Sequence, residues 1–147
     1  MQYNGNDSVV LKIKSLTETC KVPTRGDVFA AGYDLYASMP ITIKKWSRDL
    51  VHTGIAMEIP TNYYGRIAPR SSCSMKGYDI GAGVIDSSYR GEIKICFVNS
   101  TDKDCDIHVG DKIAQIIITP HITPTVLVTD TLEESERGEN GFGSTGA

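Results

Sequence analysis

The chain has 147 residues, of which 40% are hydrophobic and 22% charged, and its formal net charge is −3. A domain of this size buries roughly 70% of its unfolded surface, so it needs neither a metal ion nor a disulfide to fold. The slight acidity argues against a nucleic-acid-binding surface, which usually carries a basic stripe. No apolar run reaches the length of a membrane span. We therefore expect neither nucleic acid nor a membrane as partner, while a nucleotide ligand stays open.

Four cysteines, Cys20, Cys73, Cys96 and Cys105, stand apart from one another. No pair has the C-x-x-C spacing, and none has zinc-finger spacing to the three histidines. The N-terminus is polar and does not resemble a signal peptide. We expect reduced thiols in an intracellular protein of the cytoplasm or nucleus, with Cys96 in the core.

Strand patterns dominate the chain. We expect strands at residues 9–15, 41–45, 53–59, 63–68, 92–98 and 112–122. Turn residues separate them every eight to twelve positions, which favours an all-β sandwich or barrel, jelly rolls included. One short helix is expected at residues 71–77, with Ser71 or Ser72 as its N-cap.

Residues 81–91 hold one carboxylate, Asp86, and one ring, Tyr89, in a polar segment between the apolar arms 84–85 and 93–95. Apolar runs broken by Gly, Asp and Ser predict a hairpin. Glycines at 83 and 91 let a ligand approach bare backbone. Two interpretations stand: an ordinary hairpin whose Asp and Tyr suit the turn, or a site that recognises a planar ligand and places a base beside it.

Residues 131–147 differ from the rest, because they are acidic and then rich in glycine. We expect a β domain at 1–130 and a flexible C-terminal arm at 131–147. The arm is either a disordered tail or a lid. Arg137, Phe142 and the hydroxyls of Ser144 and Thr145 favour a lid, since such groups bind phosphates and stack on a base.

Three further positions carry chemistry. Arg70, followed by Ser71 and Ser72, suits an anion near a helix start. Asp34 is either structural or a contact to a hydrated metal ion, and Gln115 needs a polar partner within an apolar strand. One candidate base with several phosphate-type positions suits attack of water on phosphorus.

Together these segments resemble the trimeric deoxyuridine triphosphate nucleotidohydrolases, or dUTPases. Five motifs appear in the order of that family: AAGYDLYA (30–37), GRIAPRSS (65–72), GAGVIDSSYRG (81–91), GDKIAQIII (110–118) and RGENGFGSTG (137–146). The resemblance implies a jelly-roll-like β subunit and a homotrimer. It also implies three active sites at subunit interfaces, with each arm closing over a neighbour's site.

By position, the resemblance implies that Asp86 is the general base that activates water for attack on the α-phosphorus of dUTP. The products would be dUMP and pyrophosphate, which keeps uracil out of DNA and supplies dUMP. Tyr89 would pack under deoxyribose and leave no room for a 2′-hydroxyl. The remaining implied contacts are Arg70, Ser71, Ser72 and Gln115 to phosphates; Gly83, Val84, Ile85 and Lys94 to uracil; Phe142 stacked on uracil; and Arg137, Gly143, Ser144 and Thr145 to the β and γ phosphates. Mg²⁺ would be carried mainly by the triphosphate, with Asp34 touching it through water.

Three other functions would require different residues. A dCTP deaminase shares the fold but needs a glutamate where Cys96 stands. A nucleotide sensor without chemistry should lack Asp86, Tyr89 or Phe142, and all three are present. Tyr89 also argues against a less selective pyrophosphatase that accepts ribonucleotides. The family usually has Gly and Leu where Ser72 and Cys73 stand here.

Overall fold

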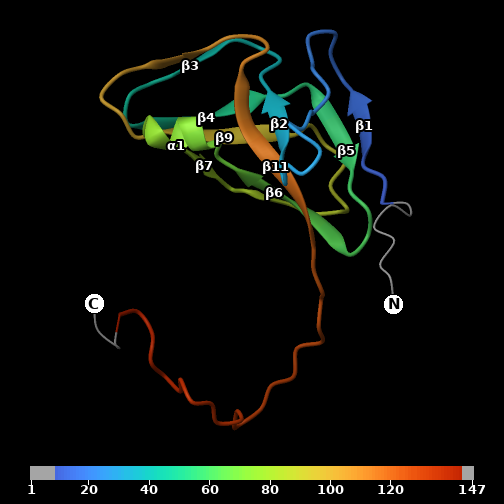
Figure 1. The fold of residues 1–147 in the computed structure, drawn as a ribbon, viewed down its shortest axis with the longest axis vertical. Helices are drawn as coiled ribbons and strands as arrows, with labels where there is room; N and C mark the ends of the chain where they lie inside the picture. Colours follow the sequence, from blue (N-terminus) through green and yellow to red (C-terminus); the bar gives the residue numbers. More distant parts are fainter. Residues whose placement is uncertain (1–8, 144–147) are drawn as a thin grey trace.

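The computed structural model describes residues 9–143, and these are almost entirely β-structure with one short helix (Figure 1). In chain order the elements are β1 Lys12–Ser15, β2 Tyr33–Tyr36, β3 Ile41–Ile43, β4 Ser47–His52, β5 Ile55–Glu58, β6 Tyr63–Ala68, α1 Ser71–Met75, β7 Tyr78–Gly81, β8 Val84–Ile85, β9 Lys94–Asn99, β10 Cys105–Ile107 and β11 Lys112–Pro120. The prediction of an all-β chain with one short helix is confirmed.

The strands form four antiparallel sheets, of which the largest has the order β2-β11-β6-β8. A second sheet has the order β4-β9-β7, and two pairs, β1-β5 and β3-β10, complete the fold. The faces that the sheets turn inward enclose one hydrophobic cluster rich in isoleucine, which suits strands because β-branched side chains pack well on a pleated surface. The fully buried members include Leu35, Ile43, Val51, Ile55, Ile93, Ile95 and Ile116.

Four strands were not predicted from the sequence: β2, β4, β7 and β10. β4 has four exposed residues in succession, so it lacks the alternation of apolar and polar residues that reveals a half-buried strand. β10 is three residues long, and β7 contains a glycine at its end. Their strand conformation is set by ladder partners, since β4 and β7 both pair with β9.

The predicted hairpin between residues 84–85 and 93–95 is wrong. β8 pairs with β6, whereas β9 pairs with β4 and β7, so the two arms belong to different sheets. The polar segment between them is a loop that crosses from one sheet to the other. Two extended segments joined by a turn were predicted correctly. Sequence periodicity does not indicate which strand each segment pairs with.

The predicted cap of the helix is also wrong. Arg70 occupies the N-cap position with an extended backbone (φ −77°, ψ 148°), and no side chain caps the helix. The carbonyl of Arg70 accepts hydrogen bonds from the amides of Cys73 and Ser74, both 3.0 Å, so Ser71 and Ser72 already lie in the first turn. The helix ends at Met75, two residues earlier than expected, because Gly77 takes a positive φ of 90°.

After β11 the chain leaves the sheets. The amide of His121 donates to the carbonyl of Asn62 at 3.0 Å, and residues 122–140 are then exposed throughout. Figure 1 shows this orange and red segment extending away from the body of the domain. Residues 9–143 therefore comprise a packed β-structure and a C-terminal segment that follows it outside the sheets.

Candidate functional site

A pocket of about 170 Å³ lies at the loop that joins β8 to β9. Its lining residues are Val84, Ile85, Asp86, Tyr89, Glu92 and Lys94. Five of these six are positions that the sequence analysis named, and Glu92 is the addition. The pocket thus gathers backbone, a ring and carboxylates from one short stretch of chain.

One edge of β8 is open toward this pocket. β8 is the last strand of its sheet and pairs with β6 on one side only. The carbonyl of Gly83 accepts a hydrogen bond from the amide of Ile67 at 2.7 Å, so Gly83 faces β6. Neighbouring residues of an antiparallel strand direct their main-chain groups to opposite sides, so the amide and carbonyl of Val84 face away from β6. A side chain at Gly83 would come within 2.7 Å of the Ile67 carbonyl, so only glycine fits. The edge offers one donor and one acceptor, as a planar amide-like ligand requires.

Tyr89 is fastened at both ends. Its amide donates to the carbonyl of Asp86 at 3.1 Å, and its hydroxyl donates to the carbonyl of Glu92 at 2.7 Å. A Cβ on Gly91 would lie 2.5 Å from the Tyr89 hydroxyl, so glycine is needed for the ring to fold over this turn. The Asp86 side chain is exposed beside the ring, and within residues 9–143 its carboxylate has no hydrogen-bond or ion-pair partner. It is therefore available to a ligand or a water molecule.

Glu92 forms the inner wall of the pocket. Both of its carboxylate oxygens lie 3.0 Å from Nδ1 of His52, and Oε2 also accepts the amide of Gly54 at 3.1 Å. Partial burial raises the pKa of the Glu92 carboxyl, but the hydrogen bonds from His52 and Gly54 and the charge of His52 and Lys94 outweigh it, so the pKa lies below its ordinary value. No sequence signal pointed to this pair, because His52 and Glu92 are 40 positions apart.

A second group of predicted residues surrounds Asp34. Its carboxylate pairs with Nε of Arg70 at 3.3 Å and with Nζ of Lys112 at 3.6 Å. Gln115 stands opposite Asp34 across β2 and β11, and its side-chain amide donates to the carbonyl of Pro69 at 3.1 Å. With Ser71 and Ser72 in the next turn, these residues form what we call the arginine cluster: Asp34, Arg70, Ser71, Ser72, Lys112 and Gln115. Lys112 was not predicted, although it lies in the fourth motif.

Asp34 is poorly placed to bind a metal ion directly, because both of its oxygens already face cations. In the described part of the chain no three His, Cys, Asp or Glu side chains gather closely enough to hold a metal ion. These residues fit an ion that keeps its ligands on a substrate and on water, as Mg²⁺ does. They do not fit a protein-made metal cage.

The pocket and the arginine cluster lie at opposite ends of β6. Ile85 pairs with Gly65 near the start of this strand, and Asp86 continues beyond it, whereas Arg70 follows the strand's other end at Ala68. Five residues of extended chain between Gly65 and Arg70 span about 16 Å. One chain therefore separates its candidate base from its candidate phosphate ligands.

The predicted arm residues lie far from both groups in sequence and are exposed. Phe142 is fully exposed, and Nε of Arg137 donates to the carbonyl of Asn140 at 2.6 Å. Gly143 has a positive φ of 79°. Ser144 and Thr145 lie outside the described residues. The arm is not placed against the pocket, so its predicted contacts with a ligand stay predictions.

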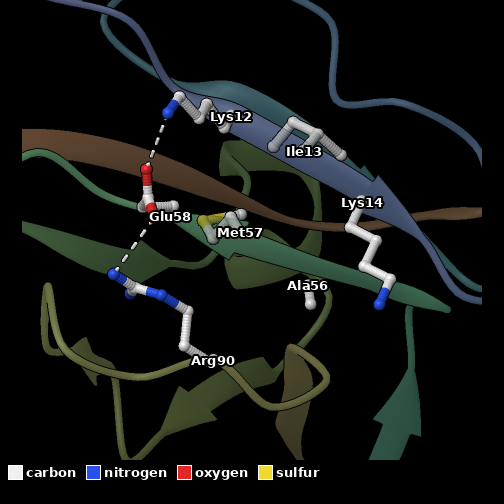
Figure 2. A pocket seen from close by; sticks show the side chains of 7 residues that line it. All are labelled: Lys12, Ile13, Lys14, Ala56, Met57, Glu58 and Arg90. Carbon is white, nitrogen blue, oxygen red and sulfur yellow. Dashed lines mark ion pairs between the residues drawn. The ribbon is translucent and has the colours of Figure 1, made fainter.

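A larger groove, of about 320 Å³, runs along β1 and β5 (Figure 2). Figure 2 shows Glu58 between two cations, with Lys12 at 3.1 Å and Arg90 at 3.3 Å. Lys12 first, and then Arg90, hold the pKa of Glu58 below its ordinary value. None of the predicted site residues lines this groove. Arg90 nevertheless affects the pocket beside Asp86. Its Nη1 donates to the carbonyl of Ser87 at 2.6 Å, and its ion pair with Glu58 connects the pocket loop, residues 81–94, to β5.

Of the helices among residues 9–143, none has the length and apolar character needed to cross a membrane.

Comparison with known proteins gives a consistent result. The dUTPase family model matches residues 18–146. The deoxyuridine 5'-triphosphate nucleotidohydrolase of Yarrowia lipolytica is 49% identical over 139 residues, which cover 92% of this chain and 88% of that protein. The dUTPase of Staphylococcus bacteriophage 80alpha, solved with dUpNHpp, aligns with a TM-score of 0.89 at 28% identity, covering 95% of this chain and all of that one. The dUTPase of phage phi11 of S. aureus, in which a structural Mg(II) ion is coordinated, aligns with a TM-score of 0.79 at 25% identity over 85% and 99% of the two chains. The jelly-roll-like fold class expected from the sequence is confirmed.

Proposed function

Because the chain belongs to the dUTPase family of hydrolases, we propose that it hydrolyses dUTP to dUMP and pyrophosphate. The observation that carries this proposal is the pocket, which combines the open edge of β8, the tethered Tyr89 ring and the unpaired Asp86 carboxylate. The β8 edge can bind a base, the Tyr89 ring can contact a sugar, and the Asp86 carboxylate can activate water for the reaction.

Uracil would be recognised by hydrogen bonds to main-chain groups. Its ring presents two carbonyl acceptors on either side of one N–H donor, and the outward amide and carbonyl of Val84 match an adjacent acceptor and donor. Gly83 and Ile85 hold this edge against β6, and Lys94 lines the pocket on β9. Main-chain groups suit selection, because a base with a different donor pattern would leave them unpaired in a desolvated site.

Asp86 would act as general base. Its exposed carboxylate can accept a proton from a water molecule while that oxygen attacks the α-phosphorus, and pyrophosphate leaves from the opposite side. Beside it, the Tyr89 ring would lie under the deoxyribose, so that a 2′-hydroxyl meets the ring. Base and sugar contacts thereby position the α-phosphorus beside the water that Asp86 activates.

The phosphates would be held by the arginine cluster and the arm. Arg70 contributes a guanidinium, Ser71 and Ser72 contribute main-chain amides in the first turn of α1, and Gln115 lies beside them. In the arm, Phe142 would stack on uracil, while Arg137, Gly143 and the neighbouring hydroxyls of Ser144 and Thr145 would hold the β and γ phosphates. Exposure of Phe142 and Arg137 supports this role, because both are available to a ligand.

Mg²⁺ would enter with the triphosphate. When bound, it neutralises phosphate charge and orients the phosphate chain. Asp34 is the residue that would face the ion, through a water molecule, because its oxygens are engaged with Arg70 and Lys112. The phage phi11 relative coordinates a structural Mg(II) ion, which supports the use of this metal in the family.

We further propose that the protein works as a homotrimer. Gly65 and Arg70 are about 16 Å apart along β6. Asp86 lies beyond the pair of Ile85 with Gly65, so a complete site would take its arginine cluster from a second copy. The segment between β11 and the arm supports the same proposal, because Ile122, Val126, Leu127 and Val128 expose between 83% and 92% of their surface. A run of exposed apolar side chains is typical of a segment that packs on a partner.

In a cell this reaction would keep uracil out of DNA and provide dUMP for thymidylate synthesis. That role places the enzyme with the nucleotide pool of the cytoplasm or nucleus.

The test is release of pyrophosphate, with Mg²⁺ present, from dUTP, dCTP, dTTP and UTP in parallel. We expect release from dUTP with dUMP as coproduct and little from the other three. Tight binding of dUTP without release would leave a nucleotide sensor, and release from dCTP or UTP at a comparable rate would overturn the proposed selectivity. Sedimentation of the same preparation should give a particle of three times the chain mass.

A further inference from the structure

Glu92 is not among the residues that the proposed reaction uses, yet it is the best-anchored carboxylate of the pocket. Its side chain is 22% exposed and its partner His52 is 39% exposed. Two donors, Nδ1 of His52 and the amide of Gly54, hold the two carboxylate oxygens. Because charge-assisted hydrogen bonds are stronger than neutral ones, this carboxylate is fixed more firmly than an ordinary surface glutamate.

The next residue is anchored to the same place. The amide of Ile93 donates to the carbonyl of Ile55 at 2.8 Å, and the hydroxyl of Thr53 donates to the carbonyl of Ile93. Residues 52–55 form the turn between β4 and β5, so the side chain of Glu92 and the backbone of Ile93 together clamp the end of the pocket loop to that turn. The clamp sets where the carbonyl of Glu92 lies.

That carbonyl holds the Tyr89 ring. It accepts the Tyr89 hydroxyl at 2.7 Å, which is the far anchor of a ring that is itself 43% exposed. The near anchor is the turn in which the Tyr89 amide donates to Asp86. A shift of the Glu92 carbonyl would tilt the Tyr89 ring about the Asp86–Tyr89 turn, and the shape of the pocket that the ring lines would change.

We propose that Glu92, held by His52 and Gly54, is a positioning residue that fixes the Tyr89 ring and thereby sets the preference for deoxyribose over ribose. The inference rests on the proposed function, because it concerns the sugar that the same pocket accepts. The Tyr89 ring can exclude the 2′-hydroxyl of ribose by steric contact only if its position is fixed within about 0.5 Å, because a ring that moves aside makes room for the extra atom. A loosened ring would thus admit UTP while still accepting dUTP.

The experiment compares kcat and KM for dUTP and UTP, with Mg²⁺, in the wild type and in Glu92→Ala and Glu92→Gln. Alanine keeps the backbone carbonyl but removes the clamp. We expect Glu92→Ala to lower the ratio of kcat/KM for dUTP to that for UTP about tenfold, mainly through faster UTP cleavage. Glu92→Gln should restore most of the ratio, because its amide oxygen can still accept from Gly54. His52→Ala, a milder change should Glu92→Ala fail to fold, should lower the ratio by an intermediate amount.

Tyr89→Phe supplies the decisive comparison, since it removes only the hydroxyl that binds the Glu92 carbonyl. In that background Glu92→Ala should lower the ratio no further, because the connection is already broken. A further drop, or an unchanged ratio in Glu92→Ala alone, would overturn the inference. His108→Ala is the matched control, because His108 also pairs with a carboxylate, that of Asp111 at 3.6 Å, outside the pocket.

Failure of the proposed function and failure of the role of Glu92 give different results. If the wild type does not cleave dUTP, the proposed function fails. If the wild type prefers dUTP strongly and Glu92→Ala keeps that preference while melting at a lower temperature, Glu92 is structural only and the proposed function stands.

Discussion

The pocket loop, residues 81–94, differs in how it is held from residues 122–143, which comprise the segment after β11 and the described part of the predicted arm. Hydrogen bonds fix the loop to three parts of its own domain, through Gly83 to β6, through Glu92 to the turn after β4, and through Ile93 to β5. Among residues 122–143 the hydrogen bonds of Thr129, Arg137 and Gly138 reach only residues two or three positions away. The pocket loop is held by distant parts of its own chain, whereas these three bonds are local.

This difference suggests a division of labour. Groups that must be placed within a fraction of an ångström, such as a general base or a wall against one hydroxyl, belong on the anchored loop. A group that closes over a ligand after it has entered belongs on a segment that costs little to move. An arm that closes over a ligand would lose conformational freedom, so its contribution to binding would be the surplus over that loss.

The largest expected effect tests the loop. Asp86→Asn removes the base while keeping the size and main chain of the residue, so dUTP should still bind. We expect kcat for dUTP hydrolysis to fall about a thousandfold with Kd little changed. Steady-state kinetics and calorimetric binding measure the two quantities. An unchanged kcat would remove Asp86 from the mechanism.

Deletion of residues 137–147 tests the arm as a whole. Because residues 137–143 lie outside the sheets, the shortened protein should keep its melting temperature and oligomeric state. Its kcat/KM should fall about a hundredfold, since the β and γ phosphates lose their lid. Full activity in the shortened protein would show that the segment is a tail without function, and loss of folding would contradict the separation described here.

Phe142→Ala tests one arm residue. A ring that stacks on a base contributes about 1–3 kcal/mol, so we expect kcat/KM for dUTP to fall about tenfold. Phe29→Ala is the matched control, because Phe29 is another almost fully exposed phenylalanine, at 96%, outside the pocket and the arm. Equal effects of the two substitutions would mean that neither ring meets the substrate.

The smallest effect concerns the loop's anchor. The folded-state pKa of Glu92 lies below its ordinary value of 4.5, so the carboxylate stabilises the fold above that pH and this stabilisation is lost as the pH falls through the folded value. Glu92→Gln cannot lose a charge, and its melting temperature should therefore fall less steeply as the pH is lowered from about 5 to about 3. Parallel melting curves for the two proteins at each pH provide the check; identical slopes would mean that other carboxylates dominate.

The sequence predicted those parts of the site that are contiguous in the chain. Val84, Ile85, Asp86, Tyr89 and Lys94 meet at one pocket because a single loop carries them. Contacts between distant strands could not be read, since they depend on register. The approach of Lys112 to Asp34 and of His52 to Glu92 follows from how β2, β4, β9 and β11 align. The predicted hairpin failed for the same reason, because an alternating pattern specifies a strand and not its neighbour.

The separation of Asp86 and Arg70 at the two ends of β6 has a consequence for mixtures of defective chains. If each site takes its base from one copy and its arginine from another, chains carrying Asp86→Asn and chains carrying Arg70→Ala are inactive alone but complement each other. In an equal mixture about one quarter of the sites would hold both intact residues by random assembly. Two kinds of defective chain would then recover activity when assembled together where neither has it alone.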